Sequence, residues 1–183
     1  MDKQRCKWCN RKNPLYIAYH DHEWGQLNYD EQYLYEMLIL ESFQAGLSWE
    51  CVLNKRENFR EAYDHFDIHK VIAYDEAKIH ALCLNQGIIR NRRKIIASVQ
   101  NSKIYQDIVQ EYGSFYQYLR TFTNDQILYE TDKTTNSLSD TISRDLQKRG
   151  MKFVGSVIIY AYLQAVGLIV SHDKDCYMYK NTL

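Results

Sequence analysis

The chain has 183 residues, the usual length of one domain, and its 45% hydrophobic and 25% charged residues are ordinary for a globular protein. Its 23 basic and 23 acidic side chains cancel, so the net charge does not indicate nucleic acid, and any such binding needs a local patch. One proline and seven glycines supply little turn chemistry. This argues against a many-stranded β-sandwich and predicts an all-α fold.

Segments that would direct the chain to a membrane are not evident. The N-terminal residues are charged and lack the apolar core of a signal peptide. The most apolar stretch, residues 154–170, is interrupted by Gly155 and Gly167 and is too short to span a bilayer. We therefore expect a cytoplasmic protein without membrane contact, and a monomer. Five cysteines, an odd number in a reducing compartment, indicate metal ligands or free thiols before disulfides.

The first half of the chain contains an irregular segment and several helices. Residues 1–30 are aromatic and polar with little periodicity, so this segment must be held by something else. Apolar residues at helical spacing predict a helix over 31–44, and a second helical segment covers 48–62. Asp75 is a suitable N-cap for a helix that runs to Leu84, and residues 88–109 predict one or two further helices.

The second half of the chain ends in a very apolar helix. Ser137 or Ser139 can cap a helix that finishes with two basic residues and Gly150, the usual C-terminal pattern. Residues 153–166 are apolar nearly all round and are closed by Gly167. A helix of this kind is buried on all sides, so we expect it to be the central helix.

Cysteine and histidine residues near the two ends of the chain have the character of metal ligands. His172 and Cys176 are four residues apart, so on a helical turn they face the same way and can bind one ion. Cys6 and His20 would complete a Cys2His2 set suited to Zn²⁺, and they would tie down both ends. Cys6 and Cys9 form a rival C-x-x-C pair, and solvent-exposed residues without a ligand are the plainer alternative.

A glycine turn followed by basic residues forms the second candidate site. Residues 82–97 read as two helices joined at Gly87, and the backbone N–H groups that open the second helix can bind a phosphate. Such a helix–hairpin–helix grips the DNA backbone without reading sequence. A solvated basic helix face explains the pattern equally well. The basic side chains are Arg90, Arg92, Arg93 and Lys94.

Aromatic residues and one carboxylate form the third group. Glu41 follows an apolar helical run, an awkward place for a carboxylate unless it has a partner or a function. Aromatic faces around one buried carboxylate suit a planar, electron-poor or cationic base, although aromatic clusters are usually core. The members of the group are Trp8, Tyr16, Tyr19, Trp24, Glu41 and Trp49.

Several of these patterns occur together in one known family. Taken in order, they resemble the 3-methyladenine DNA glycosylase I family, and the similarity extends nearly from end to end of the chain. The segments that carry it are Asn13–Gly25, Leu40–Trp49, Val52–Asn58, Gly87–Ile95, Lys148–Gly155 and Gln164–Cys176.

The resemblance implies a fold and a set of site residues. It implies a helix–hairpin–helix fold in one domain over residues 1–183, with the hairpin around Gly87 and residues 1–30 joined to 168–183. It implies one structural Zn²⁺ on Cys6, His20, His172 and Cys176, and leaves Cys9 without a role. It further implies that Glu41 and Tyr19 contact an extrahelical base and Trp49 stacks on it. Trp8, Tyr16 and Trp24 complete the pocket. The turn over residues 44–47, which includes Gly46, faces the DNA, with Leu47 as the wedge.

The implied reaction is excision of 3-methyladenine from alkylated double-stranded DNA. N3-methylation makes the attached base cationic, so it leaves neutral and needs no general acid. Water completes the hydrolysis of the N-glycosidic bond and leaves an abasic site. No residue is evident as a lysine nucleophile, so we expect no strand cleavage. The competing hypothesis is a non-catalytic module that senses methylated bases, which release of free 3-methyladenine would exclude.

Overall fold

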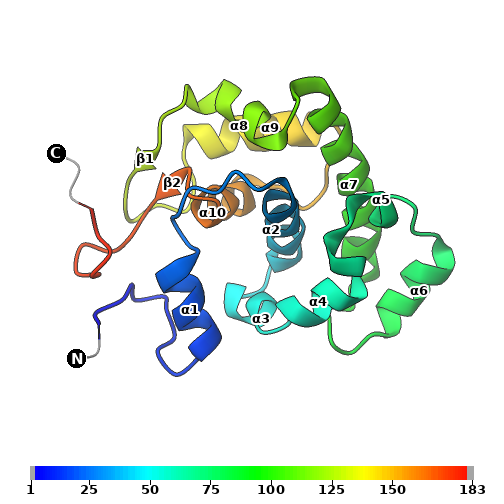
Figure 1. The fold of residues 1–183 in the computed structure, drawn as a ribbon, viewed down its shortest axis with the longest axis horizontal. Helices are drawn as coiled ribbons and strands as arrows, with labels where there is room; N and C mark the ends of the chain where they lie inside the picture. The colour runs from blue at the N-terminus through cyan, green and yellow to red at the C-terminus, as the bar shows by residue number, and fades with distance from the viewer. Residues whose placement is uncertain (1–2, 181–183) are drawn as a thin grey trace.

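The structure, a computed structural model, describes residues 3–180 and is mostly helical (Figure 1). The helices are α1 Pro14–His22, α2 Glu31–Gln44, α3 Trp49–Leu53, α4 Arg56–Ala62, α5 Ile68–Val71, α6 Glu76–Leu84, α7 Arg92–Tyr112, α8 Phe115–Thr123, α9 Ser137–Lys148 and α10 Ser156–Ala165, with a 3-10 turn η1 at Asp64–Phe66. No helix within residues 3–180 combines the length and apolar character needed to cross a membrane.

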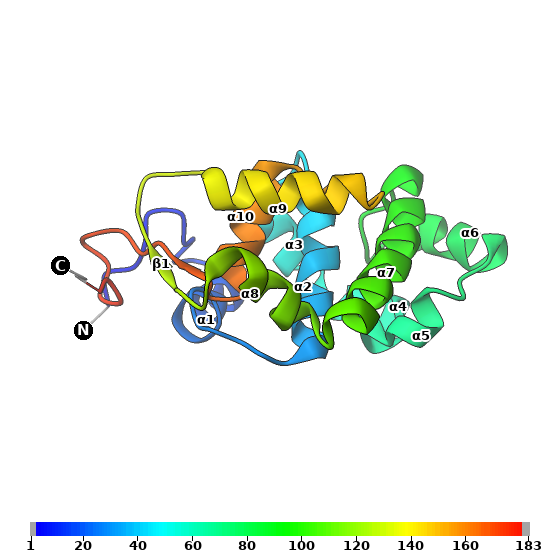
Figure 2. The same ribbon diagram turned by 90° about the horizontal axis from the view of Figure 1, so that it is seen from above.

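The centre of the molecule is α2, which has the bounds expected from the sequence. The Asp30 side chain caps it by accepting from the Tyr33 amide at 2.7 Å. Every residue from 34 to 43 is buried, because α10, α7, α3 and α8 all pack against this helix. We expected α10 to be the buried central helix, but Val157 near its start is 57% exposed. The two helices therefore share the central position (Figure 2).

Helix boundaries depart from the sequence prediction where capping residues decide them. Asn13 and Pro14 start α1 inside the segment expected to be irregular, and α8 was not expected. The segment 48–62 divides into α3 and α4. Asn91 caps α7, so that helix begins at residue 92 and not at residue 88. Asn136, not Ser137 or Ser139, caps α9 through a reciprocal capping box.

The all-α prediction needs one correction. Strands β1 Leu128–Tyr129 and β2 Ile169–Val170 pair in parallel, with Leu128 opposite Ile169. Two-residue strands are too short for an alternating pattern to be visible in the sequence. The pair nevertheless matters, because it fixes the chain that leads into the C-terminal segment.

The two ends of the described chain lie together, at the opposite end of the molecule from α6 (Figures 1 and 2). The Tyr177 amide donates to the Gln4 carbonyl at 2.9 Å, and the Gly25 amide donates to the Gln164 carbonyl at 2.9 Å. Gly167, predicted to close the apolar helix, has φ +78°. A Cβ at this position would lie 2.2 Å from the backbone at Gln26, so only glycine fits there.

Candidate functional site: a four-ligand cluster beside an aromatic pocket

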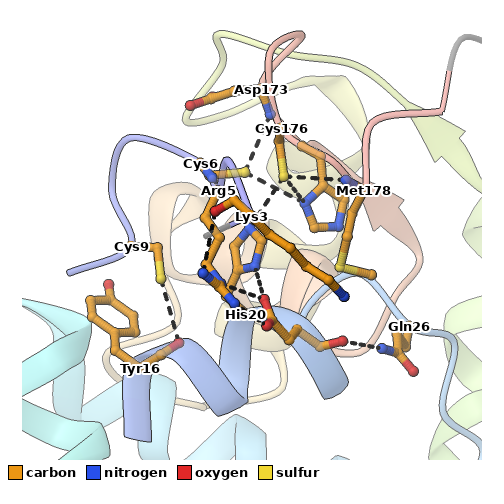
Figure 3. Close-up of polar contacts among 12 residues, drawn as sticks. Lys3, Arg5, Cys6, Cys9, Tyr16, His20, Gln26, Asp173, Cys176 and Met178 are labelled. Carbon is orange, nitrogen blue, oxygen red and sulfur yellow. Dashed lines mark hydrogen bonds and ion pairs between the residues drawn. The ribbon is translucent and has the colours of Figure 1, made fainter. Parts of the chain in front are cut away.

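The four expected metal ligands meet in one buried cluster. One donor atom from each lies within 4.8 Å of all the others, and α1 supplies His20 while segments near the two ends supply the rest. The Cys6 Sγ lies 3.4 Å from His172 Nδ1, and the Cys176 Sγ lies 3.6 Å from the same atom. The Cys176 Sγ is also 3.5 Å from His20 Nε2. Figure 3 shows Cys6, His20 and Cys176 turned toward one another.

The chemistry of these donors fits a metal ion. Tetrahedral zinc binds sulfur at about 2.3 Å and nitrogen at about 2.0 Å, so a sulfur and a nitrogen that bind the same ion lie about 3.5 Å apart. The sulfur–nitrogen distances in the cluster are close to this value. Burial lowers the pKa of His20, and lowers that of His172 to about 4, so both imidazoles are neutral at neutral pH and can donate a lone pair. The cluster can therefore hold a metal ion.

Surrounding groups orient the ligands. His20 Nδ1 lies 2.8 Å from the Asp21 carboxylate, which leaves Nε2 directed at the cluster. Arg5 binds the two Asp21 oxygens at 2.8 and 2.7 Å and thereby lowers the pKa of this carboxyl group. The backbone amide of Asp173 donates to the Cys6 sulfur at 3.3 Å. Hydrogen-bond donors and charged groups around a metal site stabilise ligands that carry negative charge when a cation is bound.

Cys9 lies outside the cluster. Its thiol donates to the Tyr16 carbonyl at 3.7 Å and is absent from the group of four donor atoms. The alternative C-x-x-C pairing of Cys6 with Cys9 is therefore not the arrangement that the structure brings together.

The six aromatic and acidic candidates line one cavity of about 290 Å³. Helix α2 supplies Glu41, the start of α3 supplies Trp49, and α1 supplies Tyr16 and Tyr19. The Tyr19 and Trp49 rings lie 5.3 Å apart and are tilted by 44°, so they form an aromatic corner beside the carboxylate. The remaining two residues are Trp8 and Trp24.

Polar atoms in this cavity are buried without partners. Within residues 3–180, Glu41 Oε2, Gln44 Oε1 and Trp49 Nε1 are inaccessible to solvent and make no hydrogen bond. Burial raises the pKa of Glu41 well above its ordinary value. Leaving such atoms unpaired costs free energy, so their presence together marks a site shaped for a ligand with complementary polar groups.

The cluster and the cavity share a wall. The Trp24 ring stands edge-on to His172 at 4.7 Å, and the Trp8 ring lies 5.3 Å from His20. Trp8 and Trp24 also contact each other at 4.8 Å. Because the ligand imidazoles support the cavity tryptophans directly, the position of the four-ligand cluster determines the shape of one side of the cavity.

Further residues line the cavity that were not predicted as part of the base pocket. Gln44 follows Glu41 by three positions, which places both on one helix face, and this spacing was the available signal. Gln164 and Ser171 both fall within the segment Gln164–Cys176, which carried the resemblance. Asp132 and Lys133, in the loop after β1, come from a region without any recognised pattern. The additional lining residues are Gln44, Asp132, Lys133, Ala161, Gln164, Ser171 and Asp173.

Helices α6 and α7, joined by a loop over residues 85–91, occupy the region where the hairpin was expected. Gly87 packs closely against its surroundings: a Cβ there would lie 3.1 Å from the Asn58 side chain, which would have to shift slightly. Arg90 and Arg93 are exposed, and exposed Arg92 pairs with Glu76 at 2.7 Å.

Lys94 differs from the other basic residues of the hairpin. Its side chain is buried, and its ammonium group donates to main-chain carbonyls at the end of α2. A phosphate cannot reach a charge in that position, so Lys94 does not belong with the basic surface expected from the sequence.

The turn after α2 presents an apolar side chain to solvent. Gly46 has φ +78°, and a Cβ built there meets nothing within 4 Å. Leu47 is 42% exposed, although it lies only two residues before the buried Trp49. This arrangement leaves Leu47 exposed at the surface, close in sequence to two residues of the cavity, Gln44 and Trp49.

Sequence and structure comparisons identify the class of protein. The family model for methyladenine glycosylase matches residues 8–179, and the chain belongs to this family. It is 43% identical over 182 residues to DNA-3-methyladenine glycosylase 1 of Escherichia coli (strain K12), covering 96% of this chain and 97% of the relative. It is 38% identical over 178 residues to the DNA-3-methyladenine glycosylase of Haemophilus influenzae, covering 94% and 96%.

Solved structures agree with this assignment. A crystal structure of 3-methyladenine DNA glycosylase I superposes with a TM-score of 0.92 at 40% identity, covering 97% of this chain and all of the other. A variant of 3-methyladenine DNA glycosylase I in complex with 3-methyladenine gives a TM-score of 0.89 at 35% identity, covering 94% and 96%.

Proposed function

We propose that this protein is a DNA glycosylase that removes 3-methyladenine from alkylated DNA by hydrolysing its N-glycosidic bond. The observation that carries the proposal is the cavity in which Glu41 Oε2 lies buried and unpaired among aromatic rings. A binding module that only gripped the DNA backbone would have no use for such a cavity. Relatives at 43% and 38% identity bear the name of this activity.

Glu41 is the residue that favours the cationic base. With no ligand bound, burial raises its pKa well above the ordinary value and so favours the neutral form of the carboxyl group. A positively charged ring beside it favours the carboxylate, since an opposite charge lowers the pKa of an acid. The carboxylate accepts from the exocyclic amine of adenine, whereas guanine presents a carbonyl there and is repelled. Tyr19 contacts the base from the same side.

Binding in the cavity supplies selectivity and rate together. Trp49 stacks on the base, with Trp8, Tyr16 and Trp24 enclosing it, and stacking contributes about 1–3 kcal/mol per base. The methylated base is already a good leaving group and departs neutral without a general acid. Interactions that strengthen as the bond breaks lower the barrier. Water then leaves an abasic site, without strand cleavage.

The remaining parts grip and open the duplex. Arg90, Arg92 and Arg93 bind phosphates at the start of α7, in the manner of a helix–hairpin–helix around Gly87. The turn at Gly46 places Leu47 as a wedge in the space that the flipped base leaves. A wedge is needed only in double-stranded DNA, which we propose as the substrate. We further propose that the protein acts as a monomer.

The four-ligand cluster holds one structural Zn²⁺ in this proposal. All four positions are filled by protein, so no site remains for substrate on the metal. Zinc would neutralise the buried thiolates of Cys6 and Cys176 and fix both ends of the chain. The histidines of the cluster also support the cavity wall, since their rings contact Trp8 and Trp24.

Release of the free base from alkylated duplex DNA tests the function. The wild-type protein should liberate 3-methyladenine, detected by chromatography, and leave abasic sites that break only after alkali treatment. Binding without release would instead identify a sensor of methylated DNA. Strand breaks without alkali would contradict the absence of lyase activity.

A further inference from the structure

Lys94 is a buried cation with an unusual set of partners. It is only 6% exposed, and its Nζ donates to the Phe43 carbonyl at 2.8 Å and to the Ala45 carbonyl at 2.5 Å. The same group lies 5.8 Å from the centre of the Phe153 ring. The acceptors of its hydrogen bonds are therefore main-chain carbonyls and not carboxylates. The Lys94 side chain thus fixes the position of the backbone that carries these carbonyls.

The two carbonyls belong to the end of α2. The last carbonyls of a helix have no partner within the helix, and the C-terminal end of the helix dipole is negative, so a cation is favourable there. Helix α2 ends at Gln44, with Ala45 as its C-cap. The Leu47 amide then donates back to the Gln44 carbonyl at 2.6 Å. Lys94 thus holds the carbonyls on either side of Gln44, where the chain leaves the helix and turns.

This short segment carries the residues that we assign to the base. Glu41 lies only two to four residues before the bound carbonyls, Leu47 projects from the turn itself, and Trp49 begins the next helix. A shift at the end of α2 would therefore move the carboxylate, the wedge and the stacking ring together.

Lys94 itself belongs to the first turn of α7. It directly follows Arg92 and Arg93, the exposed cations assigned to the DNA backbone. Asn91 caps this turn by accepting from the Arg93 amide at 3.1 Å and the Lys94 amide at 3.3 Å. The turn that meets phosphate and the segment that meets the base are thus joined by one side chain.

We propose that Lys94 is a positioning residue that holds the base-contacting end of α2 against the first turn of α7, the turn assigned to the DNA backbone. The inference rests on the proposed glycosylase function. It assigns Lys94 a role in excision without contact to the base or to phosphate. A displacement of reacting groups by about 1 Å can cost on the order of 100-fold in rate.

The test compares Lys94→Met with Tyr35→Phe. Methionine keeps the length of the side chain and loses the charge and its donors. Tyr35 also joins α2 to α7, through a buried hydrogen bond of its hydroxyl to Ser102 Oγ at 2.6 Å, but near the other end of α2. Tyr35→Phe therefore removes a tie between the same two helices away from the base-contacting segment. Lys94→Gln, which keeps N–H donors, serves as the partial rescue.

Excision is measured under single-turnover conditions on duplex DNA containing 3-methyladenine, at a temperature where circular dichroism shows every variant folded. Lys94→Met should slow excision by about 10- to 100-fold, Lys94→Gln by less, and Tyr35→Phe by less than about twofold. Affinity for undamaged DNA and its salt dependence should stay unchanged. Equal slowing by Lys94→Met and Tyr35→Phe would reduce Lys94 to a structural tie. A weaker affinity with a smaller salt slope would make it a phosphate contact.

Hydrogen exchange of the Leu47 amide provides a readout that needs no activity. In the protein without DNA, Lys94→Met should speed this exchange at least about tenfold relative to wild type, while Tyr35→Phe should leave it unchanged. Unchanged exchange in Lys94→Met would overturn the inference even if the glycosylase function holds. If Lys94→Met speeds the exchange but the wild-type protein releases no 3-methyladenine, the proposed function is wrong. The tie between Lys94 and the end of α2 would then still hold.

Discussion

The four-ligand cluster and the aromatic cavity share a wall but differ in how their buried polar groups are satisfied. In the cluster, His20 has Asp21, Asp21 has Arg5, and the Cys6 sulfur accepts from a backbone amide. In the cavity, Glu41 Oε2 and Trp49 Nε1 are buried without a partner within the described residues 3–180. A satisfied network stabilises a fold, whereas an unsatisfied one costs stability until a ligand arrives. The comparison therefore assigns stability to the cluster and function to the cavity.

Removing one cluster ligand should produce the largest loss of stability. In the proposed zinc site, Cys176→Ala would leave three buried donors that no longer enclose the ion, and both ends of the chain would lose their anchor. We expect the free energy of unfolding to fall by at least about 4 kcal/mol, measured by urea denaturation. Elemental analysis should find about one zinc per wild-type chain and less in the variant.

Cys9→Ala is the matched control for this substitution. Cys9 is equally buried and lies in the same segment as Cys6, but it is outside the four-donor group. Its loss should cost about 1 kcal/mol or less and leave the metal content unchanged. A wild-type protein without metal, or a Cys176→Ala variant as stable as wild type, would contradict the role given to the cluster.

Replacing the unpaired carboxylate should have the opposite character, a large loss of activity with the fold intact. Glu41→Gln keeps the size of the side chain and removes the charge that favours a cationic base. We expect excision of 3-methyladenine to slow by roughly 100-fold, the usual effect of losing one preorganised electrostatic group. Affinity for undamaged DNA should not change. Glu57→Gln, which removes a charge from an exposed position on α4, is the control. Full activity in Glu41→Gln would mean that selectivity arises elsewhere.

Trp49 separates stacking from polar recognition within the cavity. Trp49→Ala should weaken binding of free 3-methyladenine by about 2 kcal/mol, measured by calorimetry, because it removes the stacking ring. Trp49→Phe keeps a ring and loses the unpaired Nε1 donor, so it should cost less. If alanine and phenylalanine weakened binding equally, the N–H group and not the ring face would be the recognising element.

The sequence predicted the helical fold most accurately where hydrophobic periodicity and capping agree. The bounds of α2 and the Asp75 cap of α6 are confirmed. The predicted helix bounds were wrong where a capping residue, and not the hydrophobic periodicity, sets the start of a helix. Asn91 caps α7, which therefore begins later than the apolar pattern predicts. Pro14 starts a helix in a polar, aromatic segment that shows no periodicity. The β1–β2 pair depends on contacts between distant segments, which periodicity does not register.

The site residues divide in a similar way. Ligand chemistry and the family resemblance together predicted the four cluster residues, and the structure brings them together. Lys94 was misjudged because a run of basic residues does not tell which members face solvent: three remain exposed while the fourth turns toward carbonyls on another helix. Asp132 lines the cavity from a loop whose course depends on the β1–β2 pairing, so no local pattern could have indicated it.

The smallest expected effect is a gain of stability, and it follows from the same unpaired atom. Burial raises the pKa of Glu41 in the folded protein above its ordinary value of 4.5. Between those two pKa values the folded state holds a proton that the unfolded state has released. This difference in bound protons makes the free energy of unfolding decrease as pH rises, by at most about 1.4 kcal/mol per pH unit for one group. Below pH 4.5 both states are protonated and the effect is absent.

Glutamine does not titrate, so Glu41→Gln should be more stable than wild type by about 1 kcal/mol or more at pH 7, and the advantage should shrink toward pH 4.5. Urea denaturation of both proteins across this range gives the difference directly, because every other titrating group is common to the two and cancels. A difference between Glu41→Gln and wild type that did not change with pH would mean that Glu41 is ionised in the free protein, and the cavity would then be as well satisfied as the cluster.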